Sequence, residues 1–222
     1  MNINLYNNLI NKLLLFVSLV YINLIYSSDN YEFNLYNNYG VVGTIHTPSA
    51  RTFEEGVHGA TVYIGDPNQT VTLSSSPFNW LEASFFYTNV TDRPYCYEFA
   101  DVVCQQDFKD KGFNIKVRLK EQGVLPAIAI GFNDFAGTGI YSSEYIVGSY
   151  GINKTDFHFG IGFGLLDGSD LRFKNPFGYL SDSFYERPEL AANIGGDFQL
   201  SRYFSGETAS PFFAVSHALN NK

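Results

Sequence analysis

The sequence predicts an all-β protein: an antiparallel transmembrane barrel of the outer-membrane type, with about 8–10 of its strands in this chain. Three observations carry this prediction. From Gly40 onward, short runs alternate apolar and polar residues, which is the period of a strand with two different faces. Charged residues make up only 16% of the 222 residues, against about 25% in an ordinary soluble domain. Aromatic residues reach 17%, nearly all of them Phe and Tyr, which fits a protein with one face in lipid.

The N-terminal residues 1–28 have the features of an export signal. Lys12 precedes an apolar run at 13–22, and the small residues Ser27 and Ser28 offer a cleavage point. A polar residue directly after the run disfavours a spanning helix, which needs ~20 apolar residues. The alternative is a short membrane anchor. We therefore expect a signal peptide and export from the cytoplasm.

Residues 29–39 are rich in Asn and Tyr and have no clear periodicity, so we interpret them as a linker. The barrel domain is then expected at 40–222. Within it, nine runs have lengths near the ~9–11 residues that a tilted strand needs to cross a bilayer. These candidate spans are 58–65, 69–75, 80–90, 112–121, 125–134, 140–150, 155–166, 192–204 and 211–219.

The run at 155–166 shows the alternation most clearly. Phe159 lies on an apolar face with four further aromatic or aliphatic residues, and His158 lies on a face made of polar residues and glycines. The run at 80–90 alternates in the same way, except that Phe86 breaks its polar face. We expect the apolar faces to contact lipid and the polar faces to line the barrel interior.

The connections alternate in length as outer-membrane barrels require, with long loops on the outside and short turns on the inside. The expected outer connections are 91–111, 135–139 and 167–191, and the expected inner turns are 76–79, 122–124 and 151–154. Single-chain barrels have even strand numbers, so nine spans lead us to expect a truncated chain, unless a strand at 41–46 completes the count. A secreted β-sandwich is the soluble alternative.

The sequence holds no recognisable catalytic or metal-binding constellation. Its four histidines form no metal-spaced pair, and no nucleophile elbow is present. The alternating glycines of 160–164 lie within a strand pattern rather than at the start of a helix, so a phosphate loop is disfavoured. We expect no catalytic residue, no cofactor and no metal. The net charge of −8 also argues against nucleic acid as a partner.

Several ionisable residues fall on the polar faces of the expected strands and are candidates for lining a lumen. Such side chains set the electric field inside a pore. The alternative is that they are simply solvated. The candidates are Lys116, Arg118, Asp134, Glu144 and His158.

Two cysteines, Cys96 and Cys104, lie in one expected outer connection. An exported chain meets an oxidising compartment, where these two residues could form a disulfide. A ring of this size stabilises by about 2–3 kcal/mol in the loop-entropy picture. The alternative is two unpaired thiols.

Four segments, taken in order and spacing, resemble the YjbH-like family of outer-membrane exopolysaccharide-biosynthesis proteins. The first carries Thr47, Pro48, Ser49, Ala50 and Arg51 inside residues 43–51. The others are 77–83, 110–119 and a block at 125–131 that continues through 134–145. The similarity covers roughly residues 40–180.

The resemblance implies an outer-membrane barrel of a Gram-negative bacterium that serves exopolysaccharide biosynthesis or export as a conduit or accessory, without catalysis. Outer-membrane lipids, the exopolysaccharide and other polysaccharide-secretion proteins would be its partners. Family members are usually longer, in agreement with a truncated chain, and many are lipoproteins, although this sequence has no lipobox Cys. The alternatives are a barrel enzyme acting on a surface glycan, or a structural or adhesive secreted β-protein.

Overall fold

A computed structural model describes residues 34–95, 106–168, 170–189 and 200–219. The predicted all-β antiparallel class is confirmed. The long strands are β3 (Val57–Ile64), β4 (Asn68–Phe78), β5 (Leu81–Tyr95), β6 (Gln106–Lys120), β7 (Ala127–Asn133), β8 (Ser143–Ile152), β9 (Thr155–Gly164) and β11 (Thr208–His217). Short strands and 3₁₀ helices complete the set: β1 (Gly43–Thr44), β2 (Thr47–Pro48), β10 (Phe173–Lys174), η1 (Pro176–Tyr179), η2 (Asp182–Tyr185) and η3 (Leu200–Arg202).

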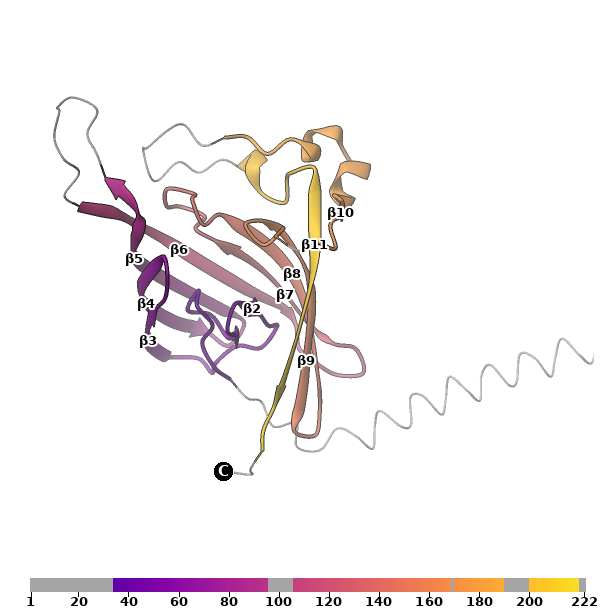
Figure 1. Cartoon of the computed structure of the whole chain (residues 1–222). Coiled ribbons are helices and arrows are strands. Elements are labelled where there is room, and N and C mark those ends of the chain that lie inside the picture. The colour runs from indigo at the N-terminus through magenta and orange to yellow at the C-terminus, as the bar shows by residue number, and fades with distance from the viewer. Residues whose placement is uncertain (1–33, 96–105, 169, 190–199, 220–222) are drawn as a thin grey trace, which may run out of the picture.

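One nine-stranded sheet dominates the molecule (Figure 1). Its strand order is β10-β11-β9-β8-β7-β6-β5-β4-β3, so apart from β10 the strands follow one another as in a meander. The sheet is open, with β3 and β10 at its two edges. Among the described residues, no helix has both the length and the apolar character needed to cross a bilayer.

Eight of the nine predicted spans coincide with long strands of the sheet. The ninth, 192–204, is wrong where it is described, because η3 and a turn occupy residues 200–204. Residues 41–46 add no strand to the large sheet either, since β1 pairs with β2 in a separate two-stranded sheet. The expected signal peptide, residues 1–28, lies outside the described residues.

The long and short connections divide between two ends of the sheet largely as predicted. The first outer connection is shorter than the expected 91–111, because residues 91–95 and 106–111 belong to β5 and β6. Because neighbouring strands are antiparallel, the β5–β6, β7–β8 and β9–β11 connections all leave one end, which we call the loop end. The β4–β5, β6–β7 and β8–β9 connections leave the opposite turn end, and they are shorter. The β8–β9 turn consists of Asn153 and Lys154 alone, and there Asn153 adopts φ 54°, a left-handed conformation that Asn tolerates.

The two faces of the sheet differ sharply in chemistry. Residues directly opposite each other on antiparallel strands share a face. One face carries polar pairs: Thr70 with Thr88, Ser84 with Asn114, Glu82 with Lys116, and Ser149 with His158. The other face carries apolar pairs: Leu73 with Phe85, Phe85 with Phe113, Ile146 with Ile161, and Phe159 with Phe213.

Burial is inverted relative to a soluble protein, because the polar face is buried and much of the apolar face is exposed. Residues 34–54, which we call the inner segment, cover the polar face. At one edge the ring of Tyr36 lies against Gly59 of β3, and toward the other edge β1 and β2 lie beside β11. A single segment reaches both sides because the sheet curves around it (Figure 1), so the polar face is concave and the apolar face convex.

Residues 34–39, interpreted from the sequence as a linker, therefore belong to the inner segment. Asn37 is buried, and its side-chain oxygen accepts hydrogen bonds from the backbone of Tyr39 and Val41. The segment has no strand periodicity because much of its backbone bonds to side chains of the sheet rather than to a neighbouring strand. The inner segment therefore shows no strand-like alternation of apolar and polar residues in its sequence.

A small apolar cluster joins the inner segment to the middle of the concave face. Ala50 meets the alanines of β7 and Tyr145 of β8 there. Tyr145 is fully buried, and its ring occupies the space above Gly131 on the neighbouring strand. A Cβ atom at Gly131 would lie 2.2 Å from that ring. The glycine is therefore required by a close approach of a rigid side chain.

We expect Gly131→Ala to lower the free energy of unfolding by about 1–3 kcal/mol, because the Tyr145 ring cannot move away inside a packed cluster. Gly123→Ala is the matched control, since nothing lies within 4 Å of a Cβ there. The control should change stability by less than about 0.5 kcal/mol. Denaturant titration of both variants measures the difference, and equal midpoints would show that Gly131 is not needed for space.

Candidate functional site

The inner segment is held on the concave face by a buried ion pair between β5 and β6. Lys116 Nζ lies 2.6 Å from Glu82 Oε2, with side-chain exposures of 0% and 2%. The ammonium also donates to the carbonyls of Val42 and Arg51, at 2.9 and 2.6 Å. The carboxylate accepts from the backbone N–H groups of Val42 and Phe53, at 3.0 and 3.1 Å. Each charge is thus compensated by its partner and by backbone of the inner segment.

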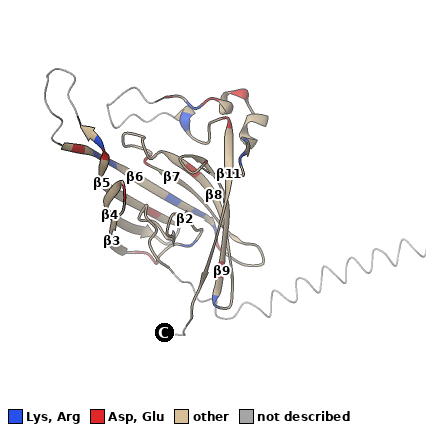
Figure 2. Cartoon of the chain, viewed as in Figure 1, with Lys and Arg blue, Asp and Glu red and all other residues tan. Residues whose placement is uncertain are grey.

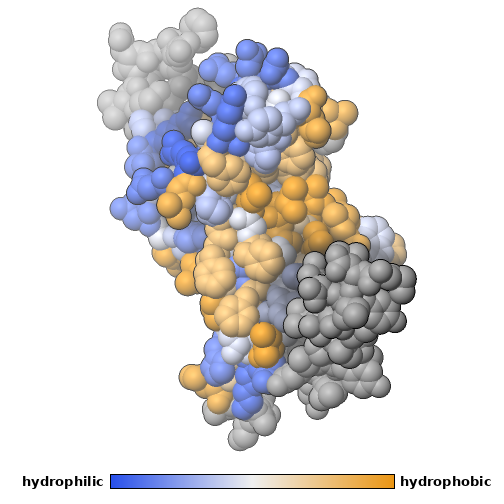
Figure 3. All heavy atoms as spheres, turned by 90° about the vertical axis from the view of Figure 1, so that its right-hand side faces the viewer, coloured by the Kyte–Doolittle hydropathy of each residue, from blue (hydrophilic) through white to orange (hydrophobic). Residues whose placement is uncertain are grey.

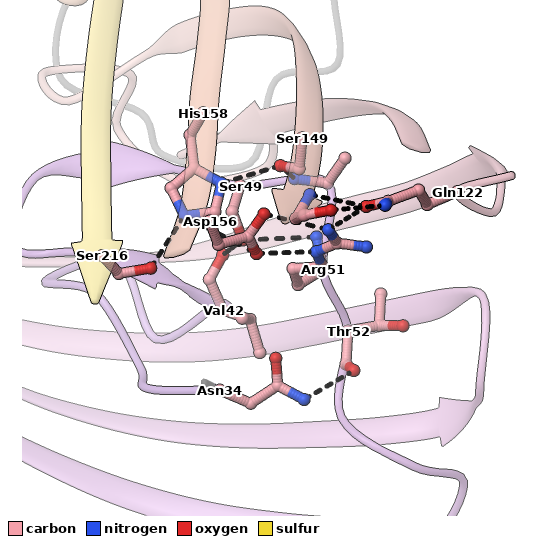
Figure 4. Close-up of polar contacts among 12 residues, drawn as sticks. Asn34, Val42, Ser49, Arg51, Thr52, Gln122, Ser149, Asp156, His158 and Ser216 are labelled. Atoms are coloured by element: carbon pink, nitrogen blue, oxygen red, sulfur yellow. Dashed lines mark hydrogen bonds and ion pairs between the residues drawn. The ribbon is translucent and has the colours of Figure 1, made fainter. Parts of the chain in front are cut away.

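A second buried ion pair fixes the same segment closer to the turn end (Figure 4). Arg51 donates to both carboxylate oxygens of Asp156 on β9, from Nε at 2.8 Å and from Nη2 at 2.9 Å. Arg51 Nη2 also donates to the side-chain oxygen of Gln122. Gln122 exchanges two hydrogen bonds with the backbone of Gly151. This contact through two nitrogen atoms fixes the orientation of the Arg51 guanidinium and also compensates its charge.

Ser149, His158 and Asp156 lie close together in this network (Figure 4), but not as a catalytic triad. Ser149 Oγ lies 2.8 Å from His158 Nδ1 and accepts the N–H of Ala50 at 2.8 Å. In a triad the carboxylate binds Nδ1 and the serine faces Nε2. Here Asp156 lies 4.0 Å from Nε2, and both its oxygens bind Arg51. The serine is fully buried and anchors the inner segment.

Four of the five residues expected to line a lumen have side chains on the concave side. Lys116 and His158 belong to the networks just described. Arg118 lies nearer the turn end, where it bonds to the exposed Glu121 at 2.7 Å. Asp134 is buried just beyond the end of β7. The structure brings Lys116 and His158 under the inner segment but leaves Arg118 and Asp134 toward opposite ends, and a role in a lumen stays a prediction.

Glu144 lies on the opposite face, which corrects its expected position. Its direct neighbours across the sheet are Phe132 and Phe163, both on the convex face. The carboxylate is fully buried and receives two hydrogen bonds of 2.8 Å from Arg187. Sequence pattern assigned Glu144 to the polar face because it is charged. The register of β8 overrides that assumption, and Arg187 compensates the charge from 43 residues away.

Residues 173–189 and 200–207, which we call the cap, cover this part of the convex face. Phe204 of the cap contacts Phe132 of β7 and Phe163 of β9, edge to face, with ring centroids 5.5 and 5.3 Å apart. Asn175 fixes the cap internally by donating to three backbone carbonyls. In Figure 2 charged residues gather at the loop end, around the cap and the distal parts of β5 and β6.

Asp134 occupies an unusual position at the loop end. It adopts φ 50°, and its carboxylate accepts the N–H of Tyr141 at 3.0 Å. A Cβ atom at Gly112 or Gly137 would meet this carboxylate, so both glycines leave space for it. Burial, and then the nearby Asp110 carboxylate, raise the pKa of Asp134 to about 7.

Four residues that complete these networks were not predicted from the sequence: Glu82, Asp156, Gln122 and Arg187. A signal was present for Glu82 and Asp156, since each is the lone carboxylate on the polar face of its strand pattern. The motif residues from Thr47 to Arg51 lie in the inner segment, where Ser49 Oγ donates to the carbonyl of Val42 at 3.0 Å. Cys96 and Cys104 lie outside the described residues.

Comparison with known proteins identifies the family. Residues 35–222 match the family described as "Exopolysaccharide biosynthesis protein YbjH". The chain belongs to the YjbH family. A relative from Escherichia coli (strain K12), named "Uncharacterized lipoprotein YjbH", is 35% identical over 182 residues, which are 82% of this chain and 26% of that protein. This YjbH-family chain thus spans about a quarter of that relative's length. No solved structure matches it.

The YjbH match begins at residue 35, so it takes in the inner segment together with the sheet. The two parts that share the buried ion pairs therefore lie within one family unit. The resemblance seen in the sequence is confirmed, and the family is related to exopolysaccharide biosynthesis.

We expect Lys116→Met to lower the free energy of unfolding by about 3–5 kcal/mol, because Glu82 then carries an uncompensated buried charge. Combining it with Glu82→Gln should recover part of the loss. Limited proteolysis of the inner segment, together with denaturant titration, measures both effects.

Arg118→Met provides the control for that experiment. It breaks an ion pair whose carboxylate is 71% exposed, so it should cost less than about 1 kcal/mol. If Lys116→Met were equally mild, the Lys116–Glu82 pair would not be what holds the inner segment.

We expect the loop end to lose stability as the pH rises through about 7. The folded-state pKa of Asp134 lies above its ordinary value of 3.8, so the folded protein favours the neutral carboxyl. Its contribution is complete below about pH 4 and disappears as the group ionises near pH 7. Unfolding free energies measured between pH 5 and 8 should fall in the wild type and stay flatter in Asp134→Asn. The exposed Asp182→Asn should fall as the wild type does.

Proposed function

We propose that this YjbH-family chain contributes part of the wall of an outer-membrane β-barrel. The barrel serves exopolysaccharide biosynthesis or export as a conduit or accessory, without catalysis. The family description supports the link to exopolysaccharide. The arrangement of the two faces of the sheet supports the membrane location.

The observation that carries the proposal is the exposed apolar convex face. Exposing a continuous apolar sheet surface to water is unfavourable, whereas contact between the same surface and lipid hydrocarbon is favourable. Figure 3 shows an apolar band across the middle of the molecule, with hydrophilic surface above and below it. Exposed side chains on this face are Val62, Ile64, Val71, Leu73, Phe113, Ile128, Phe159, Phe213 and Val215.

The polar boundaries of the convex face support the same placement. Toward the loop end of β6, Lys109 and Lys111 share the convex face with Phe113, opposite Asn89 and Tyr87 of β5. At the turn end, His217 closes β11. Charged and aromatic groups at these levels are typical of the two interfaces of a membrane barrel.

The concave face suits an interior that handles a hydroxyl-rich polymer. Its Ser, Thr and Asn side chains both donate and accept hydrogen bonds. The inner segment occupies part of this interior, so a polymer would pass beside it at the loop end. Ser149, His158 and Asp156 are buried and hold the inner segment in place rather than forming a catalytic triad, and we therefore propose no catalytic role for them.

A cell-envelope location is consistent with the relative from Escherichia coli, whose name is that of a lipoprotein. We extend this to the outer membrane of a Gram-negative bacterium, because closed barrels are the sheets that suit a bilayer. Outer-membrane lipids would then contact the convex face, and exopolysaccharide would contact the concave one.

Phe213→Arg tests the lipid contact. Phe213 is 64% exposed and lies on the convex face opposite Phe159. In lipid, an arginine there should lower the free energy of unfolding by about 2–4 kcal/mol and reduce recovery in the outer-membrane fraction. Leu180→Arg is the control, because Leu180 is 78% exposed but lies in the cap, outside the band.

Equal folding and recovery of the two variants would contradict the membrane placement, because an exposed Phe in water tolerates Arg. Recovery of the wild type as a soluble periplasmic protein, without heat-modifiable migration on gels, would do the same. Unchanged polysaccharide release in cells that lack the gene would contradict the link to export.

A further inference from the structure

The concave face has an aromatic exception that the proposed function does not use. Phe86 lies on β5 between Ser84 and Thr88, on a face otherwise dominated by small and polar side chains. It is 6% exposed, and Tyr141 from the β7–β8 connection stands edge-on to it, with ring centroids 6.1 Å apart at 88°. A role as part of a barrel wall does not by itself explain why aromatic rings lie on this polar face.

A pocket of about 260 Å³ opens beside Phe86. Its rings come from four parts of the fold: Tyr39 and His46 of the inner segment, Tyr63 of β3, Phe86 of β5, and Tyr141 of the β7–β8 connection. The pocket is smaller than the ~300 Å³ at the lower end for drug-sized ligands. It therefore suits one compact unit of a polymer rather than several units at once.

Hydrogen bonds fix the polar groups around these rings. Tyr141 donates its hydroxyl to Asn68 Oδ1 at 2.7 Å, and Asn114 Nδ2 donates to the carbonyl of Tyr39 at 2.7 Å. Burial raises the pKa of Tyr141 to about 12, so its phenol stays protonated at neutral pH. Among the residues that the structure describes, no Asp, Glu, Lys or Arg side chain lines the pocket.

We propose that this pocket binds a single uncharged pyranose unit of the polysaccharide, an assignment that rests on the proposed function. The C–H groups on one face of a pyranose carry partial positive charge and pack against the negative face of an aromatic ring. The hydroxyls at its edge match side chains that both donate and accept, such as the half-buried Asn38 and Asn68. A pocket of rings and amides without charge has the chemistry for such a unit and disfavours a uronic acid.

The position of the pocket agrees with this ligand. Tyr63 and Asn68 flank the β3–β4 connection, and Tyr141 lies in the β7–β8 connection, so the pocket lies toward the loop end of the concave face. According to the proposed function, a polymer that crosses the barrel passes this pocket. The pocket would then hold one sugar residue at a time between the inner segment and the wall.

The test is saturation-transfer NMR on the full chain in detergent micelles, with methyl β-D-glucopyranoside, methyl β-D-galactopyranoside and D-glucuronate as probes. We expect transfer to the ring C–H protons of at least one neutral glycoside and little to glucuronate. Tyr63→Ala should weaken binding roughly three- to tenfold, by loss of one ring contact. Tyr179→Ala, at a residue 81% exposed in the cap, should bind as the wild type does.

Phe86→Leu keeps apolar volume but removes a ring, and it should weaken binding in the same direction as Tyr63→Ala. Denaturant midpoints equal to the wild type show that both variants are folded. No transfer from either neutral glycoside, equal binding by Tyr63→Ala, or equal binding of glucuronate would overturn the assignment. A chain that binds glycosides but tolerates Phe213→Arg would overturn the membrane function alone. One that inserts and supports polysaccharide release without binding would overturn the pocket alone.

Discussion

The burial of charge on the concave face is the constraint on which the rest of this structure depends. Folding buries Lys116 together with Glu82, and Arg51 together with Asp156. A buried charge is tolerated only when its partner and its hydrogen bonds are all in place. Here part of those bonds comes from the backbone of the inner segment, so the sheet and the segment complete each other.

The character of the convex face follows from that constraint. Successive residues of a strand point to opposite faces, so strands that supply polar partners to the inner segment present their apolar residues outward. Few charged residues are left for that outer surface, and Phe159 and Phe213 lie side by side on it. This part of a YjbH-family protein thus has a polar concave face and an apolar convex face, and that division is the basis of the proposed place in a bilayer.

The loop end concentrates the features that depart from this regular pattern. Asp134 lies there in a left-handed conformation. The cap covers Glu144, which pairs with Arg187. The ring of Tyr141 stands edge-on to the ring of Phe86. Each departure brings together residues from connections and strands far apart in the sequence. Functional residues lie on connections more often than on the rigid scaffold that holds them. In this structure these irregular features lie at the loop end, whereas the turn end has short turns.

The sequence by itself determined the eight long strands, most of the alternation of connection lengths and the division of most strands into polar and apolar faces. These are local properties, because a period of two and a turn residue such as Asn153 are visible within a few residues. Only the tertiary structure decided that residues 34–54 fill the concave face, that Glu144 faces outward, and that Phe86 borders a pocket. Those outcomes depend on partners such as Arg187, 43 residues from Glu144, and long-range pairing leaves no periodic signal in a sequence.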